Sequence, residues 1–183
     1  SRLNSQIDGL NQATRNANDA VSMLQTAEAG LQSITETLQR MRELAVQAAN
    51  GSISDTERGY LNLEYTQLKA EIDRVADSTA FGEVKLLNGG ADPGNQKVFT
   101  FQIGQGTEAE DTLSFLVADY NVTELGQGTN ADGTDDTTKP SVNGTVISTQ
   151  GLTARAIDSI DRALDSVLGG RASLGSYQVR FEH

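Results

Sequence analysis

Apolar residues recur every three or four positions over the first 48 residues of the chain. Both core positions of nearly seven consecutive heptads carry Leu, Ala, Ile or Met, and only Gln6 interrupts the pattern. A 3.5-residue period that lasts this long predicts a single long helix with a coiled-coil-like seam. The seam positions are Leu3, Leu10, Ala17, Leu24, Leu31, Leu38 and Ala45, and Gln6, Ala13, Ala20, Ala27, Ile34, Met41 and Ala48.

A second helix is predicted directly after the first. Asn50 and Gly51 tolerate the left-handed backbone that closes a helix, so they mark the end of the first one. Ser54 and Glu57 have the spacing of a capping box, which marks the start of the next. A turn this short predicts antiparallel packing of the two helices. The seam of the second helix is predicted to be Leu61, Tyr65, Leu68, Ile72 and Val75.

The middle of the chain has a different pattern. Residues 83–90, 97–104 and 111–120 are short β-type runs bounded by Gly, Asn and Asp, which indicates two or three strands or hairpins. Residues 121–147 are rich in Gly, Thr, Asn and Asp, with almost nothing to bury. We therefore expect a surface loop there.

Helical periodicity returns near Ser148 and continues to the end of the chain. Gly169 and Gly170 lie inside this helix and make it locally weak, because each Gly costs about 1 kcal/mol relative to Ala. Arg171 and Gln178 interrupt a seam that is otherwise apolar. The apolar positions are Ile157, Ile160, Leu164, Val167, Leu174 and Phe181.

The predicted fold is mainly α with a small β region. Three long helical segments form an elongated, antiparallel, coiled-coil-like rod that carries a β-hairpin insert. Residues 1–82 and 148–183 form the discontinuous rod, residues 83–118 form the hairpin region of the same domain, and residues 119–147 form a short variable loop. The first and last helices pair only if the two ends of the chain come back together.

Composition limits the classes of partner. The net charge of −11 gives the chain no electrostatic reason to bind nucleic acid or an anionic membrane. The absence of Cys excludes disulfides and thiolate metal sites. There is no apolar run of membrane-spanning length and no leader pattern. The chain begins and ends in helical register, so we expect a fragment or a processed form.

No enzyme site emerges from the sequence, and we expect no cofactor and no metal. His183 is the only histidine, so neither a triad nor a histidine cluster can form. Gly104, Gly106 and Ala109 mimic a nucleotide fingerprint, but a turn and a strand are predicted after them instead of the required helix. Glu108 and Glu110 lie in loop-like sequence without a pocket. Four loop residues lack the Gly and Glu of a calcium loop, namely Asn130, Asp132, Asp135 and Asp136.

A second stripe runs along the first helix outside its seam. Arg40, Leu44 and Gln47 are spaced i, i+4 and i+7, so they form one ridge. On the second helix, Glu64 and Gln67, followed by Glu71, flank the seam in the same way. Antiparallel packing would bring the two edges together as one mixed surface. Spacing alone leaves open whether this ridge is a solvated shoulder or a contact surface.

Several segments resemble the inner rod domain of bacterial flagellin, the subunit of the flagellar filament. Residues 1–51, which include "QRMRELAVQAANG", are similar to the first long helix of that domain. Residues 54–89 are similar to its second helix and the start of its hairpin region. The final segment, "RASLGSYQVRFEH", is similar to its returning C-terminal helix. Gly169 and Gly170 depart from the family, which usually has polar helix formers there.

The resemblance implies a structural protein of bacterial motility that is exported unfolded by the flagellar type III route and assembles outside the cell. Its implied partners are other flagellin subunits and the flagellar export and capping proteins. Full subunits carry further terminal helices, so the resemblance also implies a truncated core that stays monomeric. The short 119–147 segment implies a minimal outer region.

The resemblance further implies recognition by Toll-like receptor 5 of vertebrate hosts. It assigns the receptor-binding arginine, leucine and glutamate to Arg40, Leu44 and Glu64. The surrounding contact positions are Gln39, Gln47 and Gln67. The same surface is expected to pack between neighbouring subunits. Two alternatives remain open: a hook–filament junction protein of the same apparatus, and an extracellular adhesin or ligand-binding module that uses residues 83–147.

Overall fold

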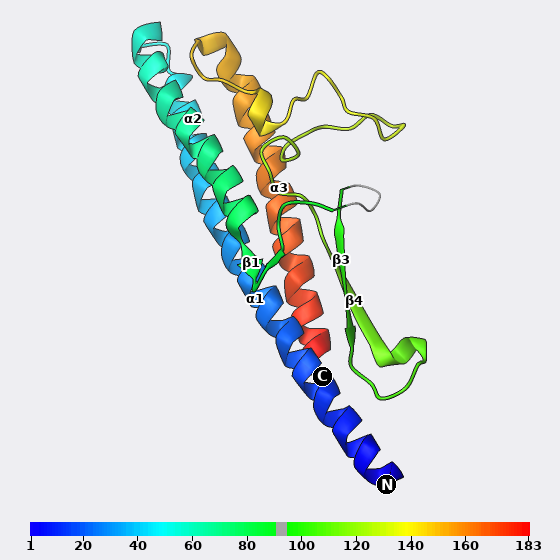
Figure 1. Cartoon of the computed structure of the whole chain (residues 1–183). Coiled ribbons are helices and arrows are strands. Elements are labelled where there is room, and N and C mark those ends of the chain that lie inside the picture. Colours follow the sequence, from blue (N-terminus) through cyan, green and yellow to red (C-terminus); the bar gives the residue numbers. More distant parts are fainter. Residues whose placement is uncertain (91–94) are drawn as a thin grey trace.

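The structure, a computed structural model, describes residues 1–90 and 95–183. Three helices form an elongated bundle: α1 (Arg2–Ala48), α2 (Asp55–Ser78) and α3 (Gln150–Glu182). Both α2 and α3 run antiparallel to α1, and the C-terminus lies beside the N-terminal half of α1 (Figure 1). The predicted fold class, a mainly α antiparallel rod with a small β region, is confirmed.

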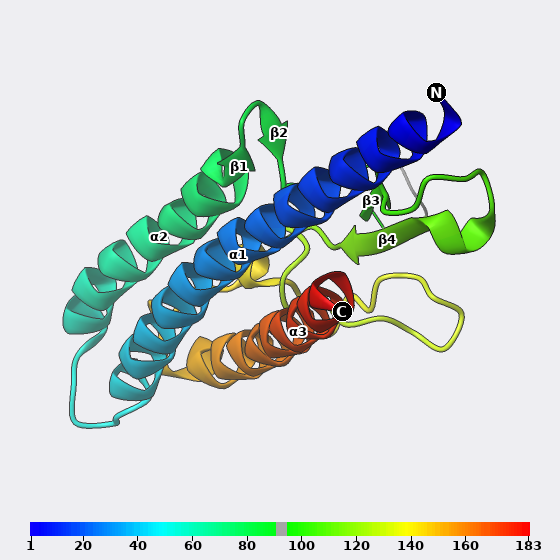
Figure 2. The ribbon, with the colours of Figure 1, turned by 90° about the horizontal axis from the view of Figure 1, so that it is seen from below.

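Helix α1 is the central helix, since it packs against both α2 and α3 (Figure 2). Its predicted seam is buried from Ala13 onward, with Ala17 partly buried. The prediction is wrong at the start of the helix, where Leu3 and Leu10 are 70% and 52% exposed. The reason is geometric: the N-terminal turns of α1 extend beyond the end of α3 (Figure 1), so no helix covers them.

Two antiparallel strand pairs complete the fold. Strand β1 (Ala80–Phe81) pairs with β2 (Val84–Lys85), and β3 (Lys97–Gln102) pairs with β4 (Thr112–Val117). The expectation of short hairpins is therefore met, although residues 91–94 of the predicted hairpin region lie outside the described residues. Two short 3₁₀ helices, η1 (Ala109–Asp111) and η2 (Val142–Gly144), follow β3 and precede α3.

Aromatic side chains attach the β3–β4 hairpin to the bundle. Alternation along both strands turns one face inward, where Phe99, Phe101 and Phe115 lie. Phe101 and Phe115 are stacked, with ring centroids 5.7 Å apart. Phe181, near the end of α3, meets Phe101 edge-on at 5.5 Å. The hairpin therefore covers the C-terminal turns of α3.

The turn between α1 and α2 is closed differently from the prediction. The capping box is confirmed: the Ser54 hydroxyl accepts from Glu57 N, and Glu57 Oε2 accepts from Ser54 N. The left-handed closure at Asn50 and Gly51 is wrong, because neither residue has a positive φ. Instead the buried Arg58 donates hydrogen bonds to Ala48 O at 2.7 Å and Asn50 O at 2.8 Å. A side chain of α2 thus satisfies the carbonyls at the end of α1.

The segment between β4 and α3 is more firmly packed than its composition suggests. The expectation of almost nothing to bury is wrong for its apolar residues, which reach the hydrophobic core at both ends of the segment. The strongly polar stretch between them lies at the surface. The buried residues are Tyr120, Val122, Leu125, Val142 and Ile147.

Tyr65 holds the second half of this segment against α2. Its hydroxyl is hydrogen-bonded to Thr145 Oγ1 at 2.5 Å, and Lys69 Nζ donates to Thr145 O at 2.6 Å. Burial raises the pKa of Tyr65 to about 12, against a small opposing effect of the hydrogen bond to Thr145. The folded state therefore favours the neutral phenol.

A pH titration of stability tests this burial. Because the folded pKa lies above the unfolded value of about 10, the contribution of Tyr65 is complete below pH 10 and is lost as the pH rises through 12. Two pKa units correspond to about 3 kcal/mol. We expect the urea-derived free energy of unfolding to fall across this window, and Tyr65→Phe to remove about that much of the fall.

Two comparisons isolate the cause. Thr145→Val removes the hydrogen-bond partner but leaves the phenol buried, so the alkaline fall should persist. Burial lowers the pKa of Lys69, and since both proteins retain this lysine its contribution cancels between wild type and Tyr65→Phe. If wild type and Tyr65→Phe showed the same pH dependence of the free energy of unfolding, the phenol would ionise freely in the folded state.

Candidate contact surface

The outer face of α1 lies between two ion pairs that join this helix to its neighbours. Arg40 Nη2 lies 2.9 Å from Glu64 Oε1 on α2. Arg42 Nε lies 2.8 Å from Asp161 Oδ1 on α3. Residues i and i+2 point about 200° apart on a helix, so the two arginines reach opposite sides of α1. Together the two pairs flank the exposed side of the central helix.

Arg40 is held from two directions. Its Nε donates to Glu64 Oε1 at 3.0 Å, and its Nη1 donates to Glu43 Oε2 at 3.2 Å. These hydrogen bonds, chiefly the one to Glu64, raise the pKa of Arg40 above its usual value, so the guanidinium stays charged. Both ends of the Arg40–Glu64 pair are about half exposed. Such a pair adds little to stability and remains accessible to a partner.

The structure brings most of the predicted ridge together. Arg40 and Glu64 form a direct contact across α1 and α2. Four of the predicted residues are exposed and Glu64 is partly exposed. The exposed ones are Gln39, Arg40, Gln47 and Gln67.

The prediction is wrong for Leu44. It was expected on the exposed ridge, but it is only 1% exposed and belongs to the core. The seam of a two-helix coiled coil is narrow, whereas α1 is covered on two sides by α2 and α3. That wider buried arc takes in Leu44, which lies about 80° from the centre of the seam. A partner therefore meets the ridge without direct access to this leucine.

Sequence reasoning missed a hollow that lies beside the ridge. Gln39, Gln47, Arg42, Glu43 and Val46 line a shallow hollow of ≈ 410 Å³ on the outer face of α1. Val46 is an exposed apolar residue, and its place on the outer side of the helical wheel could have been noticed. The Arg42–Asp161 pair joins residues 119 positions apart, and no local pattern predicts it.

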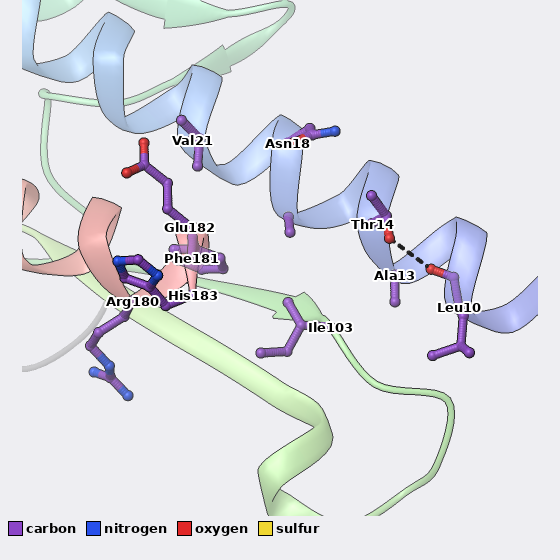
Figure 3. Close-up of a pocket in the computed structure, with 11 residues that line it drawn as sticks. Leu10, Ala13, Thr14, Asn18, Val21, Ile103, Arg180, Phe181, Glu182 and His183 are labelled. Carbon is purple, nitrogen blue, oxygen red and sulfur yellow. Dashed lines mark hydrogen bonds between the residues drawn. The ribbon is translucent and has the colours of Figure 1, made fainter.

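A second hollow lies at the other end of the rod (Figure 3). This groove of ≈ 560 Å³ separates α1 from the end of α3 and is lined by Leu10, Ala13, Ile103 and Phe181 among others. His183, the only histidine of the chain, lies at its edge. Its lining mixes apolar side chains with polar and charged ones, and Glu182 carries the one side-chain carboxylate among the residues that line it.

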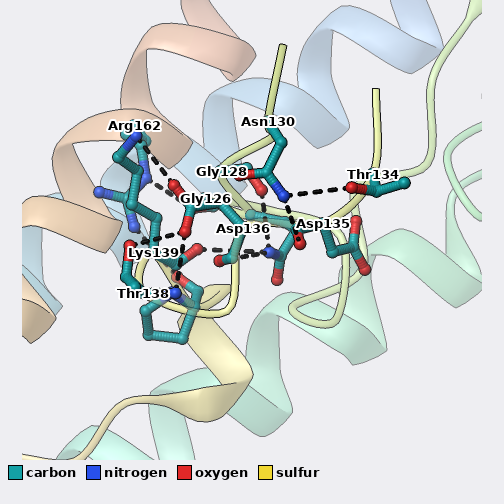
Figure 4. Close-up of polar contacts among 11 residues, drawn as sticks. Gly126, Gly128, Asn130, Thr134, Asp135, Asp136, Thr138, Lys139 and Arg162 are labelled. Atoms are coloured by element: carbon teal, nitrogen blue, oxygen red, sulfur yellow. Dashed lines mark hydrogen bonds and ion pairs between the residues drawn. The ribbon is translucent and has the colours of Figure 1, made fainter. Parts of the chain in front are cut away.

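Two of the loop carboxylates, those of Asp132 and Asp136, are engaged locally, and Figure 4 shows the contacts of Asp136. Asp132 Oδ1 accepts from Thr134 Oγ1 at 2.7 Å. Asp136 accepts from Thr138 and pairs with Lys139 at 3.0 Å, and these contacts, chiefly the Thr138 hydroxyl, lower the pKa of Asp136 to about 2. Within residues 1–90 and 95–183, no three His, Asp or Glu side chains are grouped so that they could hold a metal ion. Nor is any helix of these residues long and apolar enough to cross a membrane.

The glycines after β3 form a hairpin turn, as predicted. Asp111 O accepts hydrogen bonds from the amides of Ile103 and Gly104, which closes the turn between β3 and β4. The 3₁₀ helix η1 has only three residues and leads directly into β4. The long helix that a nucleotide fingerprint requires is therefore replaced by a strand.

The fold and this surface are those of a structural protein, a helical rod with polar and charged contact residues along one side. Known proteins give the family. The sequence model of the bacterial flagellin N-terminal helical region matches residues 1–92. Flagellin FlaB2 of Treponema pallidum is 36% identical over 100% of this chain, which spans 62% of that protein. The chain belongs to the bacterial flagellin family.

Solved structures agree with this assignment. The crystal structure of Bacillus cereus flagellin has a TM-score of 0.70 and 31% identity, and the match covers 93% of this chain and 86% of that one. A putative flagellar hook-associated protein from Vibrio parahaemolyticus has a TM-score of 0.72 at 19% identity, covering 98% and 86% of the two chains. The second likeness shows only that the fold is shared, and the flagellin assignment rests on the sequence model and on relatives such as flagellin FlaB2.

Proposed function

We propose that this chain is the helical core of a structural subunit of the bacterial flagellar filament, which serves motility outside the cell. The observation that supports this most is its membership of the flagellin family together with a rod whose polar flank is free for lateral contacts. The chain spans 62% and 60% of the length of two relatives that it matches in full. Assembly is therefore proposed for the whole subunit, with export by the flagellar type III route and contacts to capping proteins.

A graft tests the structural role. Residues 1–183 would replace the equivalent region of a full-length flagellin in cells that lack their own. We expect filaments in electron micrographs and restored swimming. The control is the same graft with Leu38→Asp, which places a charge in the core and should abolish both. A chimaera that is secreted and folded but forms no filaments would contradict the proposal.

We also propose that the strip along α1 and α2 is a protein contact surface, used between subunits and by Toll-like receptor 5. Its members are Gln39, Arg40, Gln47, Glu64 and Gln67, with Leu44 supporting it from beneath. An arginine flanked by carboxylates offers a directional charge pair that a receptor can engage in bidentate fashion. Because the pair is already formed in the free chain, little ordering is needed on binding.

Substitutions in this pair should weaken receptor signalling without unfolding the rod. We expect Arg40→Ala and Glu64→Ala each to reduce the potency in a receptor reporter-cell assay by tenfold or more, a typical loss for a central interface residue. The helical circular dichroism signal should not change, because the pair is half exposed.

Arg42→Ala is the matched control, since Arg42 forms a similar half-exposed pair on the other side of α1. It should lower the potency less than Arg40→Ala does. The double variant Arg40→Glu/Glu64→Arg keeps an ion pair but reverses its direction, and should not recover activity. Full potency in both single variants would remove the receptor proposal.

A further inference from the structure

Helix α3 carries two separate sets of contacts. Its first half is tied to the segment after β4 by polar side chains (Figure 4). Ser159 Oγ donates to Pro140 O at 2.9 Å. Arg162 Nε donates to Gly126 O at 2.8 Å, and its Nη2 donates to Pro140 O at 3.1 Å. Ser159 and Arg162 therefore hold both ends of the surface loop against residues 150–168.

The second half of α3 is tied to different partners. Arg171 Nε donates to Glu28 Oε1 on α1 at 2.7 Å. Tyr177 and Phe181 contact Phe115 of β4 with ring centroids 5.8 and 6.2 Å apart. Both halves of α3 pack against α1, the first through the Arg42–Asp161 pair and the second through Arg171 and Glu28. In addition, the first half contacts the surface loop and the second half contacts the β3–β4 hairpin.

Gly169 and Gly170 lie between these two sets of contacts. A Cβ atom at Gly169 would meet nothing within 4 Å, so no close approach requires glycine there. A Cβ at Gly170 would overlap the hydroxyl of Tyr120, which lies directly against the helix. Glycine is a weak helix former because it gains the most backbone freedom on opening. The helix is therefore easiest to open between its two anchored halves.

A surface hollow lies at the same place. A hollow of ≈ 340 Å³ lies beside Gly170, between α3 and the end of β4. Its walls include Leu116, Tyr120, Ser166 and Tyr177. Close packing normally resists the bending of a helix. Here the hollow leaves room for the two halves of α3 to move relative to each other.

We propose that Gly169–Gly170 is a hinge in α3. Residues 150–168 move with the surface loop, residues 171–182 move with the β3–β4 hairpin, and the Tyr120 phenol limits the motion on one side. The hinge goes beyond the structural role proposed above. It is a property of the monomeric chain, so its test does not depend on filament formation.

Hydrogen–deuterium exchange in the monomer gives the first test. Opening at the glycines breaks the hydrogen bonds of the amides that follow them. We expect residues 169–174 to exchange about tenfold faster than residues 156–164 and 177–181 on either side. Gly169→Ala should slow exchange at 169–174 about fivefold, in line with its greater helix propensity.

Gly151→Ala is the matched control, because it also adds a methyl group to α3 where nothing lies within 4 Å. It should leave exchange at 169–174 unchanged. A steady increase in exchange toward the C-terminus would indicate fraying and would overturn the hinge. Equal exchange along α3, or no response to Gly169→Ala, would overturn it as well.

Distance measurements separate bending from local opening. The chain has no cysteine, so spin labels can be attached to Leu152→Cys and Val179→Cys alone, at two exposed positions about 40 Å apart along the helix. We expect a broad distance distribution by electron–electron resonance, and a narrower one after Gly169→Ala. A single narrow distribution in the parent protein would rule out bending.

Discussion

Arg58→Met is expected to lower the free energy of unfolding by about 3 kcal/mol. Arg58 is only 5% exposed, and its guanidinium binds two carbonyls at the end of α1 and the carboxylate of Asp55 at 2.7 Å. Methionine keeps most of the side-chain volume but removes all of the donors, so the carbonyls of Ala48 and Asn50 lose their partner. Urea denaturation followed by circular dichroism measures the loss.

Arg74→Met is the control for this substitution. Arg74 lies on the same helix and also pairs with an acidic residue at i−3, Glu71, but it is well exposed. Its replacement should change stability far less than Arg58→Met. Equal effects of the two variants would show that Arg58 contributes only as a surface charge and that the end of α1 is closed in some other way.

Leu38→Ala is expected to destabilise the protein by about 3–4 kcal/mol, through the lost transfer free energy and the cavity that remains. Leu38 is fully buried in the core cluster of the central helix. A cavity at this position affects a helix that packs against both α2 and α3. Thermal and urea unfolding should both show the loss.

Leu63→Ala provides the comparison, since Leu63 is 63% exposed on α2. Its effect should stay within about 0.5 kcal/mol, as for most surface substitutions. A small effect of Leu38→Ala would mean that the heptad seam does not hold the rod together.

Periodicity predicted the rod well because a long helix shows its buried side directly in its own sequence. The seam of α1 is buried from Ala13 onward, and the Ser54–Glu57 capping box forms as expected. Periodicity does not show how many other helices pack against α1 or how much of its surface they cover. For this reason periodicity predicts that the buried Leu44 is exposed and that the exposed Leu3 and Leu10 are buried.

Contacts between distant residues were also beyond local patterns. No spacing pattern points to Arg58, which closes the end of α1 across ten positions. The Arg42–Asp161 pair spans 119 positions. Residues 121–147 are predicted to bury almost nothing, because the apolar residues that reach the core there, such as Val122 and Leu125, are few and are scattered among polar neighbours. By contrast, antiparallel packing of two adjacent helices predicts that the edges carrying Arg40 and Glu64 lie together, and the two side chains form an ion pair there.

The central claim is that this rod is the packing core of a filament subunit and that the Arg40–Glu64 strip lies in its contacts. The most direct measurement is an electron cryo-microscopy reconstruction of filaments formed by the full-length subunit. We expect bundles of α1, α2 and α3 packed side by side, with Gln39, Arg40 and Glu64 facing a neighbouring subunit. A filament in which this strip faces open solvent, away from every neighbour, would contradict it.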